Sequence, residues 1–236
     1  DQLKLLDVQA LDQRLAKLAH QRRSHPSLAA LEEVTARADD LDRARVDAET
    51  AVRDARRAVT KAETDVEQVS NRAARDRQRL ESGTGSPKDL QALGHELESL
   101  AKRQSDLEEV ELEAMEVLET AQGELDAIST QRSALGEQIT QLETERDAAF
   151  AEIDAEKATV EQQRASAVEP LDQGLVTLYE RVRERSGGLG VLRLRGSTTD
   201  PLQISLSLTE LAAIEAAPAE EIVRSEDGYI IVRVTD

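Results

Sequence analysis

Apolar residues recur at every third and fourth position along two long stretches of the chain. The first stretch runs from Leu31 to Leu80 and the second from Leu90 to Ile153. This alternating spacing is typical of a coiled-coil seam, in which one face of a helix packs against a partner helix. Two glycines and a proline lie between the stretches and indicate a turn at residues 82–87. Because a short connection joins antiparallel neighbours, the sequence predicts a helical hairpin.

The arms of this hairpin are expected at residues 27–81 and 88–169, and the apolar stretches within them are each on the order of 80 Å long. Residues 1–24 carry an apolar stripe of their own, which is interrupted at Pro26 because proline removes a backbone donor and disfavours helix at the preceding residue. Ser27 is expected to cap the next helix. A last stripe predicts a helix over 171–186, which ends where glycines begin.

The position of the turn also predicts the register of the arms. If the turn centres near Thr84, residues that face each other have numbers that sum to about 168. Residues 104–131 hold nine acidic and no basic side chains, and this register places basic residues of the first arm beside them. The expected partners are Arg53, Arg56, Arg57 and Lys61 beside Glu108, Glu109, Glu111 and Glu113. The same sum sets Val8 opposite Val160, so the first helix should continue the pairing.

Beyond residue 190 the apolar spacing changes to two, which predicts strands near 192–194, 204–208 and 230–234. Residues 226–228 indicate a hairpin turn before the last strand. Thr209 is expected to cap a short helix that Pro218 terminates. The fold class is therefore mainly α, with a coiled-coil hairpin over 1–186 and a small α+β head over 187–236. The expected head core consists of Leu202, Ile204, Leu206, Leu211, Ile214, Ile222, Tyr229, Ile231 and Val234.

Composition limits the possible functions. A third of the residues are charged, 1% are aromatic and the net charge is −18, so the core is thin, and attraction to anionic membranes or nucleic acid is disfavoured. The chain has no cysteine, which excludes disulfides and thiolate metal sites. No apolar run approaches the roughly 20 residues that cross a bilayer. A cytoplasmic protein without membrane association is expected.

The sequence offers no constellation for catalysis. The three histidines, His20, His25 and His95, are scattered, and no nucleophile with a nearby base is visible. The glycines at 187–190 follow a helix and precede a strand, the reverse of the order that dinucleotide binding requires. We therefore expect no enzyme activity, no cofactor and no metal.

Two groups of basic residues differ from the acidic background and are candidate partner-binding residues. Each group could dock an acidic partner or phosphates, or could simply balance neighbouring acids. The tip group is Arg72, Arg75, Arg77, Arg79 and Lys88, and the junction group is Arg181, Arg183, Arg185, Arg193 and Arg195.

Several segments carry a resemblance to a known family. They are Gln-Leu-Lys-Leu-Leu-Asp-Val-Gln at 2–9, Ser-Pro-Lys-Asp-Leu-Gln at 86–91, His-Glu-Leu-Glu-Ser-Leu at 95–100, and the closing segments 221–224 and 230–233. With this order of parts, the chain resembles the bacterial zinc-ribbon proteins with a coiled-coil hairpin. Its high Ala, Arg and Asp content suggests an actinobacterial, mycobacterial member.

The resemblance implies two Cys-x-x-Cys pairs in the head, near Thr199 and Leu202 and near Ser225 and Asp227. None of these residues is Cys or His, and a structural zinc site needs nitrogen or sulfur ligands, so this member is expected to have lost its zinc site. The family is associated with nucleic-acid or transcription-factor contacts, and some relatives are flagellar or sigma-factor adaptors.

Three functional hypotheses follow. The first is a non-enzymatic coiled-coil adaptor, monomeric or dimeric, with a protein partner. The alternative is a nucleic-acid-associated accessory protein that uses the tip or junction arginines. A third is structural self-association through the hairpin.

Overall fold

The computed structural model describes residues 2–218 and 221–233. Its helices are α1 (Gln2–Arg23), α2 (Pro26–Glu81), α3 (Pro87–Val168), α4 (Gln173–Arg185) and α5 (Leu208–Ala216). The chain forms two compact units: the hairpin unit, residues 30–142, and the head unit, residues 1–29 together with 143–236. The mainly α fold class with a small C-terminal sheet is confirmed. None of the helices within the described ranges is long and apolar enough to cross a membrane.

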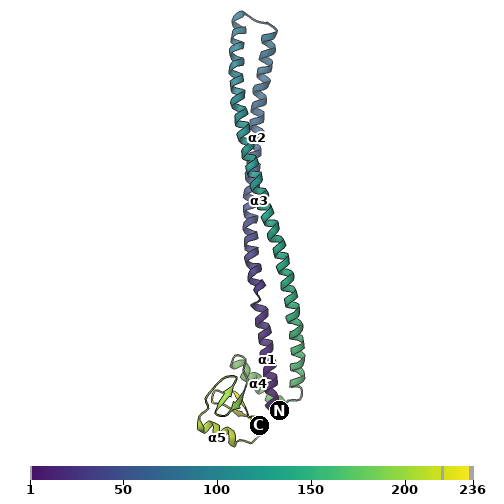
Figure 1. Ribbon diagram of the computed structural model, residues 1–236, viewed down its shortest axis with the longest axis vertical. Coiled ribbons are helices and arrows are strands. Elements are labelled where there is room, and N and C mark those ends of the chain that lie inside the picture. Colours follow the sequence, from purple (N-terminus) through teal and green to yellow (C-terminus); the bar gives the residue numbers. More distant parts are fainter. Residues whose placement is uncertain (1, 219–220, 234–236) are drawn as a thin grey trace. The chain divides into compact units, whose positions relative to one another are not determined.

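In the hairpin unit, α2 and α3 run antiparallel (Figure 1). The seam predicted from the three-four spacing is the part of each helix that is buried. It is built largely from alanine and valine, so the helices meet over a thin apolar layer. The buried seam residues are Val34, Ala38, Ala48, Val52, Ala55, Val59, Ala62 and Ala73 of α2, and Leu100, Leu107, Ala121 and Leu135 of α3.

The turn between α2 and α3 lies where the sequence predicts it. Gly83 and Gly85 have φ angles of 63° and 145°, which favour residues without a side chain. Asp89 accepts hydrogen bonds from the Ser86 amide (3.0 Å) and hydroxyl (2.7 Å), and the Ser86 hydroxyl accepts one from the Asp89 amide (3.3 Å). This reciprocal cap fixes the first turn of α3, and its hydrogen bonds lower the pKa of Asp89.

The predicted register holds only near the turn. Arg72 lies 2.7 Å from Glu96, and their numbers sum to 168, as expected. Farther along, Arg132 lies 2.9 Å from Asp42, and their numbers sum to 174. Neither helix is interrupted in between, so a local break does not account for this drift.

The drift makes the expected row of basic-to-acidic pairs between the arms wrong. Arg57 forms its ion pair with Asp54 of its own helix (3.2 Å), and Arg53 donates to the Thr50 hydroxyl (2.8 Å).

In the head unit, α1 also pairs with α3 in a register different from the prediction. Arg164 of α3 binds Asp12 of α1, and their numbers sum to 176. A sum of 176 sets Val8 opposite Val168 and not opposite Val160, and Ala167 and Val168 pack against the core cluster that contains Val8. The non-helical residues between α1 and α2 explain part of this offset, because extended residues advance about 3.3 Å each and helical residues about 1.5 Å.

The break between α1 and α2 is confirmed, but its cap differs from the prediction. α2 begins at Pro26, a residue suited to the first helical position. The His25 ring nitrogen Nδ1 accepts from the Ser27 amide (3.3 Å) and bonds the Ser27 hydroxyl (2.7 Å). Ser27 is therefore not the cap; His25 is. Its ring also packs edge-on against Phe150, with ring centroids 5.9 Å apart.

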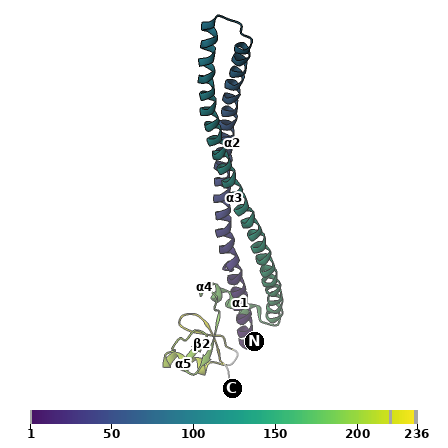
Figure 2. The ribbon, with the colours of Figure 1, turned by 45° about the horizontal axis from the view of Figure 1, so that its top comes forward.

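The head sheet has the strand order β2-β1-β4-β3. In Figure 2 it lies in the yellow-green region that carries the labels β2 and α5. β1 (Val191–Arg195) pairs in parallel with β4 (Ile230–Arg233), whereas β2 (Thr198–Asp200) and β3 (Val223–Arg224) pair antiparallel at the two edges. The hairpin turn at 226–228 is confirmed, with Gly228 at φ 86°.

Two head predictions are wrong. Residues 204–208 form no strand and make a single bridge through Ser205 to Thr198, because this segment turns into α5. The N-cap of α5 is Ser207, and not Thr209; it forms a capping box with Glu210. Val234 lies outside the described residues.

Each face of the sheet packs against helices. Val191, Ile230 and Val232 face α1 and α4, and Leu192 and Ile231 pack against Leu206 and Ile214 on the α5 side. Two predicted core residues, Leu202 and Ile222, are 40% and 39% exposed, which corrects that prediction. The sheet is thus the middle layer of the head unit, and α1 supplies part of the core on one of its faces. The domain boundary expected between residues 186 and 187 stays a prediction.

Candidate interaction site

The tip group of basic residues lies at the end of α2 and the start of α3. Arg72 forms ion pairs with Glu96, at 2.7 Å, and with Asp76, at 3.8 Å. Arg75, Arg77, Arg79 and Lys88 are exposed, and none forms an ion pair within the ranges that the structure describes. Residues two apart on a helix point in nearly opposite directions, so Arg77 does not share a face with Arg75 and Arg79. The structure therefore brings these cations to one end of the hairpin but does not place them on one face.

The junction group does not converge either. Arg183 pairs with Glu180 (2.8 Å), Arg185 donates to the Asp227 carbonyl (3.4 Å), and Arg195 lies 4.0 Å from Asp200. Arg181 is exposed on α4 and Arg193 is half-buried on β1. Three of the five arginines are therefore engaged within the head unit.

A buried carboxylate that the sequence analysis missed organises the head unit. The Asp12 side chain is 4% exposed and accepts hydrogen bonds from Arg164 (2.6 and 3.2 Å) and from the Tyr179 hydroxyl (2.8 Å). Arg183 approaches it to 3.5 Å, and Glu180 bridges the two arginines. Burial and the bond to Asp12 raise the pKa of Tyr179. These groups satisfy one another and tie α1, α3 and α4 together, so we assign them a structural role.

Gln9, about one helical turn before Asp12, bonds α1 to the start of β1. Its side-chain oxygen accepts from the Gly190 and Val191 amides, both at 2.8 Å, and its nitrogen donates to the Val191 carbonyl at 2.8 Å. A side chain at Gly190 would lie 2.5 Å from the Tyr179 ring. The sequence analysis gave no signal for these contacts, because they join residues 181 and 182 positions apart along the chain.

The positions expected to replace zinc ligands do not fit a metal site. Thr199 is 1% exposed, and its hydroxyl donates to the Leu202 carbonyl (2.6 Å) and accepts from the Ile204 amide (3.3 Å). The Ser225 hydroxyl accepts from the Tyr229 amide (3.2 Å). Each hydroxyl therefore closes its own loop. Among the described residues, no group of three His, Cys, Asp or Glu side chains is placed to hold a metal ion.

An open apolar groove lies between α2 and α3 in the hairpin unit, with a volume of about 740 Å³. Its apolar lining is Val59 of α2 and Leu112, Met115 and Leu118 of α3. Leu112 and Met115 are 61% and 49% exposed. Neither belongs to the predicted seam, so the pairing of the two helices leaves them uncovered.

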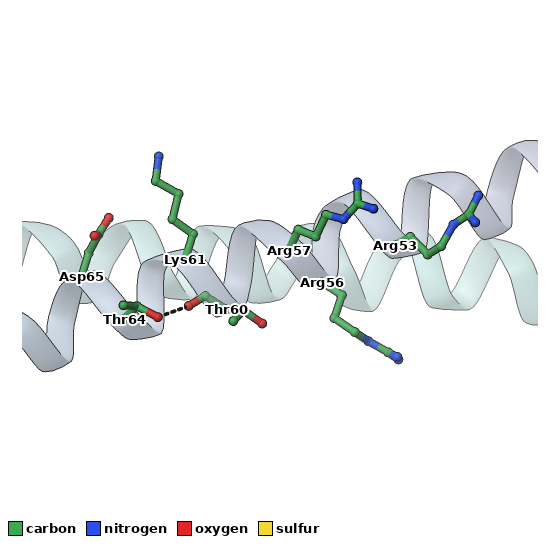
Figure 3. A pocket seen from close by; sticks show the side chains of 7 residues that line it. All are labelled: Arg53, Arg56, Arg57, Thr60, Lys61, Thr64 and Asp65. Atoms are coloured by element: carbon green, nitrogen blue, oxygen red, sulfur yellow. Dashed lines mark hydrogen bonds between the residues drawn. The ribbon is translucent and has the colours of Figure 1, made fainter.

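The two sides of this groove carry opposite charge. Arg56 lines it from α2, and Glu116, Glu119 and Asp126 line it from α3. Arg56 also borders a second hollow on the outer surface of α2. There, the side chains of Arg57 and Lys61 point away from Arg56 (Figure 3). The charged residues that line the apolar groove are therefore mainly acidic. Arg53, Arg57 and Lys61 of α2 lie outside its lining.

The acidic segment of α3 is unneutralised. None of the nine carboxylates in residues 104–131 forms an ion pair in the part of the chain that the structure describes. This acidic run was visible in the sequence. The predicted register paired it with basic residues of α2, and that register is wrong. The exposed Leu112 and Met115 were missed because they lie off the seam.

Comparison with known proteins agrees with this architecture. An uncharacterised protein of Mycobacterium tuberculosis strain H37Rv is 35% identical over 234 residues, which cover 99% of this chain and 95% of the relative. An uncharacterised protein of Mycobacterium leprae is 29% identical over 225 residues, covering 93% and 95%.

Solved structures show the same fold. A structure from Mycobacterium smegmatis superposes with a TM-score of 0.85 at 32% identity, covering 99% of this chain and 97% of that one. The structure of CT398 from Chlamydia trachomatis has a TM-score of 0.70 at 17% identity, covering 98% and 97%. Residues 8–187 match the model of the CT398-like coiled coil hairpin domain. The chain therefore belongs to the CT398-like coiled-coil hairpin family.

Proposed function

We propose that the protein is a non-enzymatic, cytoplasmic coiled-coil adaptor that binds a protein partner through the hairpin unit. The observation that carries this proposal is the groove lined by Val59, Leu112 and Met115, in which Leu112 and Met115 are apolar side chains that the protein itself leaves uncovered. Exposed apolar patches rimmed by polar residues mark sites of protein interaction.

The arrangement of the titratable groups supports a role without catalysis. Asp12, the most buried carboxylate in the part of the chain that the structure describes, is bonded to Arg164 and Tyr179, and these bonds hold three helices together. The groove in the hairpin unit contains three carboxylates and one guanidinium but is open to solvent. A catalytic acid or base needs a substrate held within hydrogen-bond reach, and sites of catalysis usually exclude water.

We further propose that the head descends from a zinc ribbon whose metal-binding function has been replaced by hydrogen bonding. The support is the position of Thr199 and Ser225, both buried and both bonded within the loops where the family resemblance places cysteines.

A second candidate is a nucleic-acid-associated accessory role for the tip. It is favoured by Arg75, Arg77, Arg79 and Lys88, which are exposed and not neutralised by neighbouring acids within the described ranges. The net charge of −18 opposes this role, so the protein-binding role is preferred.

Photo-crosslinking in cells distinguishes the two functions. The full chain would carry benzoylphenylalanine at Leu112, in the groove, or at Arg77, at the tip. We expect a discrete protein adduct from the groove position that nuclease treatment leaves intact. Adducts formed only at the tip and removed by nuclease would favour the nucleic-acid role, and the absence of any adduct would contradict both.

A further inference from the structure

α3 carries a second heptad-spaced stripe beside its seam. Leu112, Met115, Glu119, Gln122 and Asp126 follow one another at steps of three, four, three and four residues, and all line the groove. This is the spacing with which a helix presents one face to a neighbouring helix. The stripe spans 15 residues, or about 21 Å of helix, which matches four turns of a docked helix.

The shape of the groove therefore suits a third helix. Its lining combines Val59 of α2 with Leu112 and Met115 of α3, so an occupant would insert apolar side chains between the two helices. An amphipathic helix that lays its apolar face into a groove with i, i+3, i+4 and i+7 anchors is a common mode of recognition.

The charge around the groove specifies the flanks of that helix. Glu116, Glu119 and Asp126 line it against Arg56 alone. The surrounding acidic segment of α3 carries nine carboxylates and no base. Complementary charge sets which partner binds and how fast it associates, so the occupant's polar residues must be mainly Lys or Arg. A nucleic acid or an acidic helix would meet like charge here.

We propose that the groove lined by Val59, Leu112 and Met115 binds a basic amphipathic helix of a partner protein. The inference rests on the proposed adaptor function and names the chemistry of its partner. Apolar residues of the partner helix fill the groove, and its Lys or Arg residues face Glu116, Glu119 and Asp126. A second copy of this chain is the competing occupant, because the α2 surface around Arg53, Arg57 and Lys61 is basic.

The first test measures peptide binding to the full chain by fluorescence anisotropy near physiological salt. The probe is a labelled Leu/Lys peptide with leucines at heptad spacing. The controls are a scrambled peptide of the same composition and a Leu/Glu peptide with the same pattern. We expect the patterned Leu/Lys peptide to bind at least about tenfold more tightly than the scrambled one, and the Leu/Glu peptide not to bind. Equal binding of the patterned and scrambled peptides would overturn the proposal.

Paired variants locate the site. Leu112→Ser/Met115→Ser removes the two exposed apolar residues of the groove lining. Val110→Ser/Val117→Ser removes two apolar residues that are also exposed, at 50% and 59%, but lie outside that lining. We expect the first pair to weaken binding of the Leu/Lys peptide by about tenfold or more and the second to leave it unchanged. Equal effects of both pairs would overturn the proposal.

Charge is tested with the same logic. Glu116→Lys/Glu119→Lys and Glu109→Lys/Glu113→Lys change the net charge equally, but only the first pair lines the groove. All four residues are exposed, so the fold should persist, which circular dichroism would check. A loss of binding confined to the first pair supports the groove, whereas equal losses would show nonspecific attraction and overturn the inference.

Two outcomes separate this inference from the proposed function. If the Leu/Lys peptide fails to bind but a protein adduct forms in cells at Leu112, the adaptor role stands and the basic-helix partner is wrong. If the peptide binds at the groove but no protein adduct forms, the adaptor role fails.

Sedimentation of the full chain tests self-association: a dimer abolished by Glu116→Lys/Glu119→Lys, but not by the control pair, would identify a second copy as the occupant and overturn the proposal.

Discussion

The head unit and the hairpin unit bury different kinds of side chain. The head unit encloses large aliphatic residues and Tyr179, and it buries the charged Asp12 at 5% exposure. The seam of the hairpin unit is mostly alanine and valine, and its ion pair between Asp42 and Arg132 has side chains that are 39% and 34% exposed. The head unit therefore uses its polar groups to bond to itself. The hairpin unit leaves apolar and charged groups accessible, as a surface for binding requires.

The largest expected effect concerns the two ion pairs. Asp12→Ala removes the acceptor of the Tyr179 hydroxyl and one of the two carboxylates that bind Arg164. Because a hydrogen bond to a charged group contributes about 1.5–3 kcal/mol, the loss of these bonds should cost about 3 kcal/mol or more. Asp42→Ala breaks an ion pair open to solvent and should cost about 0–1 kcal/mol. Urea denaturation, followed separately in each unit by hydrogen exchange, measures both. Similar losses for the two variants would remove the contrast between the units.

The same glycine-to-alanine change should act in opposite directions in the two units. Gly190→Ala places a methyl group 2.5 Å from the Tyr179 ring, and such overpacking costs about 1–3 kcal/mol. At Gly94, inside α3, no atom beyond the adjacent residues and the nearby backbone of the helix lies within 4 Å of the added carbon, so Gly94→Ala should stabilise the helix by about 0.5–1 kcal/mol. Thermal unfolding compares the variants. A neutral Gly190→Ala would show that α4 does not pack tightly on the sheet.

The third prediction is a loss of head stability at high pH. Folding raises the pKa of Tyr179 above its ordinary value of 10.0. A group with a raised folded pKa contributes its full stability below the unfolded pKa and loses it as pH rises towards the folded one. The melting temperature should therefore fall above about pH 10, and Tyr179→Phe should flatten that fall at the cost of about 1 kcal/mol for a lost hydrogen bond.

Tyr229→Phe is the control for this pH series, since the chain has only two tyrosines. It should retain the alkaline slope of the wild type. An unchanged slope in Tyr179→Phe would mean that the Asp12 bond does not hold the hydroxyl protonated.

The smallest expected effect is none at all. A chelator should leave the melting temperature of the head unit unchanged, because Thr199 and Ser225 close their loops by hydrogen bonds and the core of Leu192, Ile214 and Ile231 supplies apolar stability. Elemental analysis should find no stoichiometric zinc. A chelator-induced drop in melting temperature that zinc reverses would contradict this account of the head.

Much of the fold was predictable because it depends on local periodicity. The three-four spacing predicted both long helices, and the glycines and Pro87 predicted the turn, with helix ends within two residues of those observed. The β3–β4 turn was predictable from Glu226, Asp227 and Gly228 for the same reason. Such signals belong to neighbouring residues and do not depend on what packs against them.

The remaining features depend on contacts between residues distant in sequence. Gln9 and Asp12 look like ordinary polar helix residues until α4 and β1 are placed against them. The register of the hairpin drifts away from its turn, so simple counting placed Arg53 and Arg57 beside the wrong acids. Neither local periodicity nor counting from the turn predicted the groove. Its exposed residues Leu112 and Met115 lie off the seam, and their exposure depends on how α2 and α3 pack.

Hydrogen exchange of the full chain with and without the Leu/Lys peptide tests the central claim most directly. The account predicts slower exchange of backbone amides at residues 112–126 of α3 and in α2 around Val59, with no change in the head unit or at the tip. Protection confined to the tip around Arg75 and Arg79, or to the head around β1 and β4, would contradict it.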